Sequence, residues 1–320
     1  MLVFVCETVT GGDYVGDALP EELIAEGELM RDALVGDLED LPGVRVVTTH
    51  DSRLEPPPRG QSRAIGPGDD PRVIWSDIAA TVHCCWPVAP EMDGILARLV
   101  GQLRARNPRV IACDGPTLHA CASKMRTAEI LAAAGIPVVP TWWPAAVPAG
   151  TTGPFVMKPD DGAGAMDVRL FQQLPPPPYP AGVVAQPLIE GIPASLTLLC
   201  QAGRTHVLAA NRQHVSVVDG HFQFSGVTVG GVPLDATVRD LATRIGAALP
   251  GLHGIIGVDY IATVGGPVVM EVNPRLTTSY AGLRRALGIN PLAFVAEIIR
   301  DGAVPDLPHL PPALPVEVRL

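Results

Sequence analysis

Residues 268–275, VVMEVNPR, combine the residue types of a metal site with the pattern of a strand. Side chains alternate along a strand, so Glu271 and Asn273 are expected on one face and the apolar Met270 and Val272 on the other. A carboxylate and an amide oxygen two residues apart are ligands that suit Mg²⁺. The segment therefore predicts one side of a magnesium site, although a solvated hairpin face would show the same alternation.

A third oxygen ligand stands in the preceding apolar run, GIIGVDYIATV, which contains Asp259. The two runs are typical of a β-hairpin that turns at residues 265–267. If the turn has three residues, Asp259 lies opposite Asn273 and converges with Glu271. If the turn has two residues, Asp259 points to the other face. We expect the three-residue turn and a site for Mg²⁺, with Mn²⁺ as the alternative cation.

One of the only two lysines, Lys158, ends the apolar run FVMKP and precedes a glycine-rich segment, DDGAGAMD. Gly162 and Gly164 allow a backbone to approach an anion closely. This is not a Walker A loop, because the lysine comes before the glycines. The pattern predicts a phosphate clamp, with a plain surface turn as the alternative. The other lysine is Lys124, and the scarcity of lysine reflects either a need for ammonium groups at both positions or chance.

In order and spacing these motifs resemble the ATP-grasp ligases over residues 115–300. The likeness rests also on SKMRTAEILAAAGIPVVPT, which holds Lys124, and on VVAQPLIEG. The resemblance implies an α+β chain, with an ATP-grasp fold behind an N-terminal α/β (pre-ATP-grasp) domain. It further implies that the chain uses ATP and Mg²⁺.

The same resemblance implies roles for individual residues. The metal trio described above corresponds to the ligands of the family, and Lys158 and Arg275 correspond to its catalytic residues at the reacting phosphoryl group. Pro193 stands where the family often has an acid for the ribose, so Glu190 is the candidate for that contact. The residues expected to bind the nucleotide are Lys124, Lys158, Gly162, Gly164, Gln186, Leu188 and Glu190.

A narrower likeness extends into the N-terminal third, through ETVTGG, LPEELIAEGELM, TTHDSR and APEMDGIL, and continues in NRQHV and NPRLTTSYAGL. These segments are similar to a subgroup that joins L-glutamate to tyramine for methanofuran-type one-carbon carriers. The likeness implies a carboxylate–amine ligase that acts through an acyl phosphate. Its substrates would be L-glutamate and either tyrosine or tyramine, in the biosynthesis of a methylofuran-type carrier. Glu26 and Glu91 are candidates for binding the ammonium of the amine, and Arg275, Arg212 and Asn211 for binding the glutamate carboxylate.

Two other interpretations stay open. One is another ligase of the same fold, such as a peptide ligase or a carboxylase subunit. The other is a nucleotide-binding sensor without turnover. The sequence decides neither the acceptor amine, nor which glutamate carboxylate is activated, nor the oligomeric state, for which a homodimer is one alternative.

The elements that position these residues alternate between β and α in the first third of the chain. The pattern predicts strands at 2–6, 44–48 and 109–113, helices at 20–40 and 91–106, and a long loop over 53–72. Further helices are expected at 117–134, 235–249 and 291–301, with short strands from residue 183 onward. We expect three domains: an N-terminal α/β substrate domain at 1–114, a small lid subdomain with the glycine-rich loop at 115–190, and a large subdomain with the metal site at 191–320.

The composition excludes several classes of protein. The formal net charge is −10, and nucleic-acid binding needs clustered positive charge, so no nucleic-acid partner is expected. No run of about 18 apolar residues is present, so no membrane span is expected. The N-terminal MLVFVCETVTGG lacks the basic start of a signal peptide, and six cysteines without regular spacing fit reduced thiols. We therefore expect a cytoplasmic enzyme that acts on small molecules.

Overall fold

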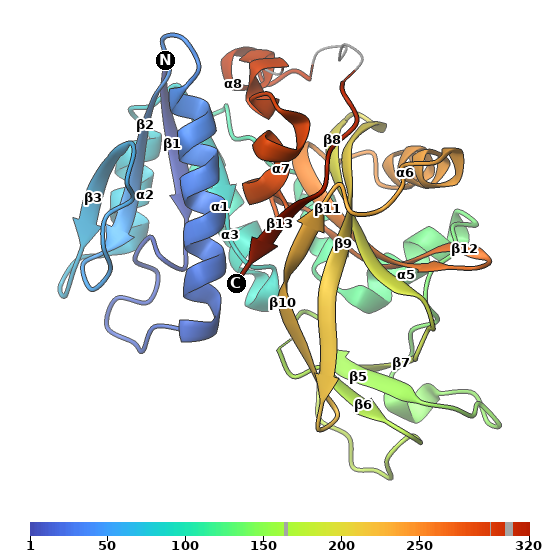
Figure 1. Ribbon diagram of the computed structural model, residues 1–320. Helices are drawn as coiled ribbons and strands as arrows, with labels where there is room; N and C mark the ends of the chain where they lie inside the picture. The colour runs from blue at the N-terminus through green and yellow to red at the C-terminus, as the bar shows by residue number, and fades with distance from the viewer. Residues whose placement is uncertain (163–165, 295, 305–309) are drawn as a thin grey trace.

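The computed structural model describes residues 1–162, 166–294, 296–304 and 310–320. Its strands form a parallel sheet near the N-terminus and a larger antiparallel sheet in the rest of the chain (Figure 1). Helices pack against both sheets. Of the helices that the structure describes, none is long and apolar enough to cross a membrane.

The N-terminal sheet has the strand order β3-β2-β1-β4, and its neighbouring strands are all parallel. Alternate residues of β1 enter two cores, since Val3 and Val5 pack with α1 while Phe4 and Cys6 pack with α2 and α3. A parallel sheet that is covered on both faces needs such unbroken apolar strands. The bounds are β1 Leu2–Glu7, β2 Arg45–Asp51, β3 Gln61–Ile65, β4 Cys84–Val88, α1 Glu21–Glu39, α2 Pro71–Ala79, the 3₁₀ turn η1 Met92–Gly94 and α3 Ile95–Arg104.

Two expectations for this region are wrong. The segment 53–72, expected as a loop, contains the edge strand β3. Only Ile65 of β3 is buried, so this polar strand carries no hydrophobic periodicity. The expected strand at 109–113 makes only an isolated bridge between Val110 and Cys85.

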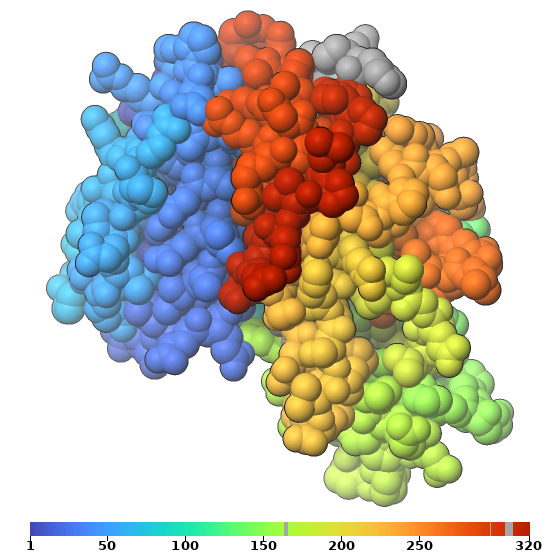
Figure 2. All heavy atoms as spheres, viewed as in Figure 1, coloured from blue at the N-terminus to red at the C-terminus, as the bar shows by residue number. Residues whose placement is uncertain are grey.

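The second sheet has the strand order β12-β11-β8-β9-β10-β6-β5-β7, and β13 pairs with β10. In the described part of the chain, β6 and β10 pair at one position, Arg169 with His221. The unit made of β5, β6 and β7 therefore projects from the rest of the molecule, away from the N-terminal part (Figure 2). The bounds are β5 Phe155–Pro159, β6 Arg169–Phe171, β7 Val183–Pro187, β8 Ile192–Gln201, β9 Arg204–Val218, β10 His221–Val229, β11 Gly254–Thr263, β12 Gly266–Asn273 and β13 Val316–Arg319.

The helices of this second part differ from expectation in three places. The helix expected over 117–134 is broken at Ser123, whose hydroxyl accepts a hydrogen bond from the Arg126 amide at 3.0 Å and so begins a new helix. The helix expected over 291–301 is a 3₁₀ turn followed by a short helix, and the helix α7 was not expected. The helix expected at 235–249 is confirmed as α6. The bounds are α4 Gly115–Cys121, α5 Lys124–Ala133, η2 Pro144–Ala146, α6 Ala236–Ala248, α7 Tyr280–Leu287, η3 Pro291–Phe294 and α8 Ala296–Asp301.

Helices α1 and α7 join the two parts of the molecule (Figure 1). The buried Asp37 carboxylate on α1 accepts hydrogen bonds from the Tyr280 hydroxyl at 2.8 Å and from Arg284 at 3.2 Å. Residue 114 caps α4, and residue 190 lies between β7 and β8. The division into three domains at these residues stays a prediction.

Candidate active site

The hairpin of β11 and β12 carries the three expected metal ligands in a register that differs from expectation. Thr263 pairs with Gly266, so the turn has two residues and the expected three-residue turn is wrong. A β-bulge at Met270 compensates, because Tyr260 pairs with Val269 whereas Asp259 pairs with Glu271. A bulge inserts one unpaired residue and shifts the register beyond it by one position.

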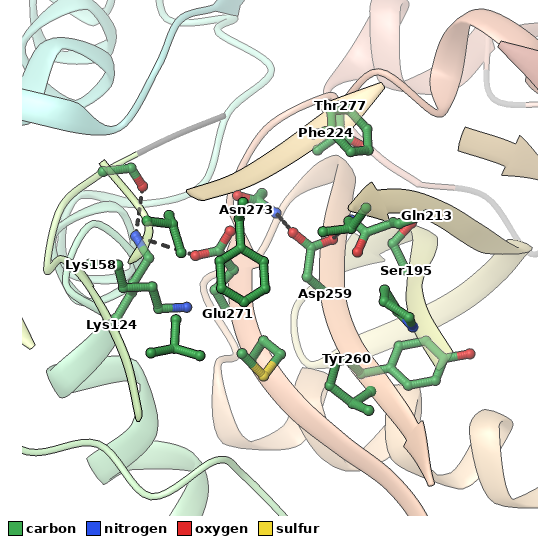
Figure 3. Close-up of a pocket in the computed structure, with 18 of the residues that line it drawn as sticks. Lys124, Lys158, Ser195, Gln213, Phe224, Asp259, Tyr260, Glu271, Asn273 and Thr277 are labelled. Atoms are coloured by element: carbon green, nitrogen blue, oxygen red, sulfur yellow. Dashed lines mark hydrogen bonds and ion pairs between the residues drawn. The ribbon is translucent and has the colours of Figure 1, made fainter. Parts of the chain in front are cut away.

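The three oxygen-bearing side chains therefore share one face of the hairpin (Figure 3). The Asn273 amide donates a hydrogen bond to Asp259 Oδ2 at 3.2 Å, and Gln213 of β9 donates to Asp259 Oδ1 at 3.0 Å. Lys124 Nζ lies 3.3 Å from Glu271 Oε2. Gln213 was not expected at this site. Gln213 lies two residues after Asn211 on the same strand, so the two side chains share a face. This spacing is visible in the sequence and could have indicated Gln213 as a further candidate.

The electrostatics of this trio fit a divalent cation. Burial, together with the neighbouring charge of Glu271, raises the pKa of Asp259 to about 8. Burial acts on Glu271 in the same direction, but the ammonium groups of Lys124 and Lys158 outweigh it and lower the pKa of Glu271. A divalent cation between the two carboxylates would keep both ionised, and the amide oxygen of Asn273 would complete a set of hard ligands.

Both lysines lie at the same end of the cavity. Lys158 on β5 is buried, which lowers its pKa to about 8. Lys124 begins α5 and donates from Nζ to the Gly162 carbonyl at 2.6 Å, so it links the start of the glycine-rich segment to the metal trio. Gly164, which we also expect at the phosphates, lies outside the described residues.

The cavity beside these charges has an apolar wall. Strand β5, near one edge of the large sheet, and strands β11 and β12, at the other edge, both contribute to it. Met270 lines the same cavity as Glu271 and Asn273, so the expectation that it lies on the opposite face of the strand is wrong, and the bulge is the reason. Such a slot suits the planar base of a nucleotide. Its aliphatic, methionine and phenylalanine residues are Val156, Met166, Val168, Leu188, Ile189, Val215, Phe222, Phe224, Val227, Ile261 and Met270.

Of the three residues expected on β7 and in the segment after it, one contributes to this wall. Leu188 lines the cavity, whereas Glu190 is exposed and lies outside its lining. Gln186 is buried behind the wall, where its amide donates to the Thr141 hydroxyl at 2.9 Å. The buried Gln186 Oε1 has no hydrogen-bond partner in the structure.

The basic candidate Arg275 lines the cavity and contacts one of the acidic candidates. Arg275 Nε lies 2.9 Å from Glu91 Oε1, and Arg275 Nη2 donates to Glu91 Oε2 at 3.1 Å. Glu26 also lines the cavity and accepts a hydrogen bond from the Thr278 hydroxyl. The structure thus brings residues from three distant segments to one place.

The two candidates on β9 lie elsewhere. Asn211 is fully buried and donates hydrogen bonds to Ser195 and Thr197, at 3.2 and 3.1 Å. Arg212 is exposed and lies outside the cavity lining, because neighbouring side chains alternate between the faces of a strand. The expectation that these two residues contact the glutamate carboxylate is therefore corrected.

Two known protein families match separate parts of the chain. Residues 121–279 match the family of the ATP-grasp domain, and residues 44–117 match the pre ATP-grasp 3 domain. The chain belongs to the ATP-grasp family. The expected α+β fold, with a pre-ATP-grasp domain before the ATP-grasp domain, is confirmed.

Individual relatives of this ATP-grasp protein agree with the assignment. The tyramine–L-glutamate ligase of Methanocaldococcus jannaschii is 25% identical over 201 residues, which are 62% of this chain and 57% of that protein. The chain thus matches a little over half of the length of this relative, and the match bears out the narrower likeness expected from the sequence.

Solved structures show the same fold. An ATP-grasp superfamily protein from Archaeoglobus fulgidus superposes with a TM-score of 0.72 at 19% identity, over 100% of this chain and 99% of that one. The L-amino acid ligase from Bacillus licheniformis superposes with a TM-score of 0.62 at 17% identity, over 94% of this chain and 74% of that one. At these identities the likeness concerns the fold alone.

Proposed function

We propose that this ATP-grasp protein is an ATP-dependent ligase that joins a carboxylate to an amine through an acyl phosphate. The observation that carries the proposal is the convergence of Lys124 and Lys158 on the face of the hairpin that holds Asp259, Glu271 and Asn273. Two ammonium groups and a hard-oxygen trio beside an apolar slot can bind a nucleotide triphosphate with its metal. A protein that only binds a nucleotide does not require two buried carboxylates that a metal must neutralise.

Different residues of the cavity bind the base, the phosphates and the metal. The apolar wall around Leu188 and Met270 holds the base, while Lys124 and Lys158 neutralise phosphate oxygens. Mg²⁺, held by Asp259, Glu271 and Asn273, would offset the charge of the β- and γ-phosphates.

The chemistry has two steps. In the first step, an oxygen of the substrate carboxylate attacks the γ-phosphorus, and the bond from that phosphorus to the β-phosphate oxygen breaks, which yields an acyl phosphate and ADP. In the second step, the amine nitrogen attacks the acyl carbon, phosphate leaves and the nitrogen loses a proton. The product is an amide. Enclosure of the site would protect the acyl phosphate from water.

We further propose L-glutamate as the carboxylate and tyrosine or tyramine as the amine, in the formation of a methylofuran-type one-carbon carrier. The match to the tyramine–L-glutamate ligase supports this choice. The charges in the cavity are compatible with it, since Arg275 and Glu26 line the same cavity as the metal trio.

The test measures ADP release by the purified protein with ATP, Mg²⁺ and L-glutamate, with and without tyrosine or tyramine. We expect ADP release only when both partners are present, and a glutamyl amide of the expected mass. A different productive pair would replace the substrates but keep the ligase. If no pair of acid and amine stimulates ADP release, the ligase proposal is wrong.

A further inference from the structure

A chain of polar side chains runs from the core of the large sheet to the cavity. It begins at Asn211 of β9, which is fully buried. The Asn211 amide nitrogen donates hydrogen bonds to the hydroxyls of Ser195 and Thr197, two residues of β8 that share a face. Asn211 Oδ1 accepts a hydrogen bond from the Gly230 amide at 3.3 Å, so the nitrogen, and not the oxygen, faces the two hydroxyls.

The chain continues into residues 277–279, which follow β12. The hydroxyl oxygens of Thr197 and Ser279 lie 2.9 Å apart, and those of Ser279 and Thr277 lie 3.1 Å apart. Ser279 stands at the N-cap position of α7 but makes no capping hydrogen bond, so its hydroxyl is available to this chain. Gly257 of β11 lets Thr277 approach the sheet, because a Cβ atom at Gly257 would lie 2.5 Å from Thr277 Cγ2.

Burial fixes the direction in which these hydroxyls donate. Thr197 is 1% exposed, and its oxygen accepts the hydrogen bond from Asn211. Among the described residues, the Ser279 oxygen is the acceptor within reach of the Thr197 proton, and a buried proton without an acceptor is strongly unfavourable. Thr197 therefore donates to Ser279, and Ser279 donates to Thr277. The Thr277 proton is left for an acceptor in the cavity, which Thr277 lines.

A second branch of the chain ends at Ser195, which also lines the cavity. Its oxygen accepts the hydrogen bond from Asn211, and in the part of the chain that the structure describes no acceptor for its own proton lies within hydrogen-bond distance. Ser195 pairs with Asp259, so this hydroxyl lies on the strand next to the metal trio. Figure 3 shows the two lysines on one side of the trio, and Ser195 and Thr277 on the other. The cavity thus has two uncharged donors at the end away from the lysines.

We propose that the hydroxyls of Ser195 and Thr277 bind an oxygen of the substrate carboxylate, and that Asn211 is the positioning residue that orients both of them. Both hydroxyl oxygens already accept a hydrogen bond and both protons remain to be donated, which suits a carboxylate and not an ammonium. Arg275 lines the same cavity and supplies the positive charge that the hydroxyls lack. Asn211 itself does not touch the substrate.

The inference rests on the proposed ligase activity, in which the carboxylate attacks the γ-phosphorus in line with the departing ADP. The carboxylate and the ADP thus lie on opposite sides of the γ-phosphate. Since the lysines are proposed to neutralise the phosphates of ATP, the carboxylate belongs at the end of the cavity where the two hydroxyls lie.

The experiment measures activation of the acid without an acceptor amine. The nitrogen of hydroxylamine attacks the acyl carbon and loses a proton, phosphate leaves, and the hydroxamate is quantified. The other reactants are ATP, Mg²⁺ and L-glutamate, or the acid that wild type converts if L-glutamate is inactive. Thr277→Val removes one hydroxyl at constant shape, and Thr277→Ser restores it. Thr152→Val, at an exposed threonine, is the matched control.

Two further variants test the role of Asn211. Asn211→Asp keeps the shape of the side chain but replaces the donor with an acceptor, so the hydroxyls would turn their protons inward. Thr197→Val leaves Asn211 in place and interrupts the chain before Ser279, and it decides the same point if Asn211→Asp does not fold. Melting curves check the folding of every variant.

We expect Thr277→Val to raise the KM for L-glutamate at least about tenfold, while the KM for ATP stays within about twofold of wild type. Thr277→Ser should stay within about threefold of wild type for both substrates, and Thr152→Val should change neither. Asn211→Asp and Thr197→Val should also raise the KM for L-glutamate. In the Thr277→Val background, Thr197→Val should add little, because both act through the same hydroxyl.

Two kinds of result would contradict the inference. An unchanged KM for L-glutamate in Thr277→Val, or an equal rise in the KM values for L-glutamate and ATP, would overturn the carboxylate site. Additive losses from Thr197→Val and Thr277→Val would refute the positioning role.

A binding measurement covers the case in which the ligase proposal itself fails. If wild-type protein forms no hydroxamate with any carboxylate, the ligase proposal is wrong. Calorimetric titration with L-glutamate in the presence of ATP and Mg²⁺ then still decides the inference, since Thr277→Val should weaken binding about tenfold relative to wild type and to Thr152→Val. Equal affinity in all three proteins, or no binding to any of them, would refute the carboxylate site.

Discussion

The Arg275 guanidinium at the end of β12 is held by the Glu91 carboxylate, which belongs to the loop after β4 of the N-terminal sheet. The nitrogen–oxygen distances of this two-point ion pair are 2.9 and 3.1 Å, and both side chains are buried to more than nine tenths. Arg275, which we propose to act at the reacting phosphate, is thus oriented from another part of the molecule.

The first prediction concerns Glu91 as a positioning residue. Glu91→Gln removes the charge that orients Arg275, so kcat should fall about tenfold or more while the KM for ATP stays near the wild-type value. Steady-state kinetics and a melting curve check this, with the exposed Asp93→Asn as control. A higher KM for ATP with an unchanged kcat would show that Arg275 serves only in binding.

The second prediction concerns the metal trio. In Asp259→Asn the repulsion between Asp259 and Glu271 is removed, so the metal-free variant should melt at the wild-type temperature or above. Turnover should be lost. Mg²⁺ with ATP should raise the melting temperature of the wild-type protein but not that of the variant. Thermal shift and ADP release measure both effects. A variant that still gains stability from Mg²⁺ with ATP would place the metal elsewhere.

The third prediction concerns Lys158. Lys158→Arg keeps a positive charge but replaces a compact ammonium with a wider, planar group in a buried position. We expect kcat/KM for ATP to fall at least about tenfold, which corresponds to about 1.4 kcal/mol. Arg126→Lys, an exposed exchange on α5, is the control and should have wild-type kinetics. Wild-type kinetics in Lys158→Arg would mean that this ammonium has no part in phosphate binding.

The fourth prediction concerns the contact between α1 and α7. Burial raises the pKa of Asp37 above its ordinary value of 3.8, so the folded protein binds this proton more tightly than the unfolded chain. The contribution of Asp37 to stability is therefore complete below about pH 3.8 and is lost as the pH rises through the folded-state pKa. Tyr280→Phe removes a hydrogen bond at 2.8 Å that this carboxylate accepts, and should cost about 1–3 kcal/mol when the carboxylate is ionised.

Urea unfolding at pH 4.5 and pH 8 measures the effect of Tyr280→Phe. The loss of stability should be greater at pH 8, where ionised Asp37 depends most on its donors. Tyr179→Phe, in the proline-rich segment before β7, should be neutral at both values. An equal loss at the two pH values would show that Asp37 does not change its charge between them.

Local patterns in the sequence are sufficient to predict the residue types of the candidate site. Strand alternation put Glu271 and Asn273 on one face, and the run before the turn supplied Asp259. The position of Lys158 before a glycine-rich segment likewise indicated phosphate binding. These features are local, because they depend on the period of a strand and on residue type. Predictions based on them hold even when an element begins or ends a few residues away from its expected bounds.

The way in which these residues come together depends on contacts between distant segments of the chain. The bulge at Met270 cannot be seen in the sequence, since it follows from the pairing of two strands. It places Asp259 on the same face as Glu271 and Asn273 although the turn has two residues and not the expected three. Arg212 and Gln213 are neighbours in the chain, but the packing of β9 sends one to solvent and the other to Asp259.

The same holds for the acids near the substrate. The sequence gives no reason to prefer Glu26 or Glu91 as the acid that binds an ammonium group, because each is an acid on an amphipathic segment. The fold pairs Glu91 with Arg275 at ion-pair distance, whereas Glu26 accepts a hydrogen bond from Thr278 and acts on Arg275 through its charge. A charge relationship between residues 184 positions apart depends on how two domains pack, and no local pattern of residues carries that information.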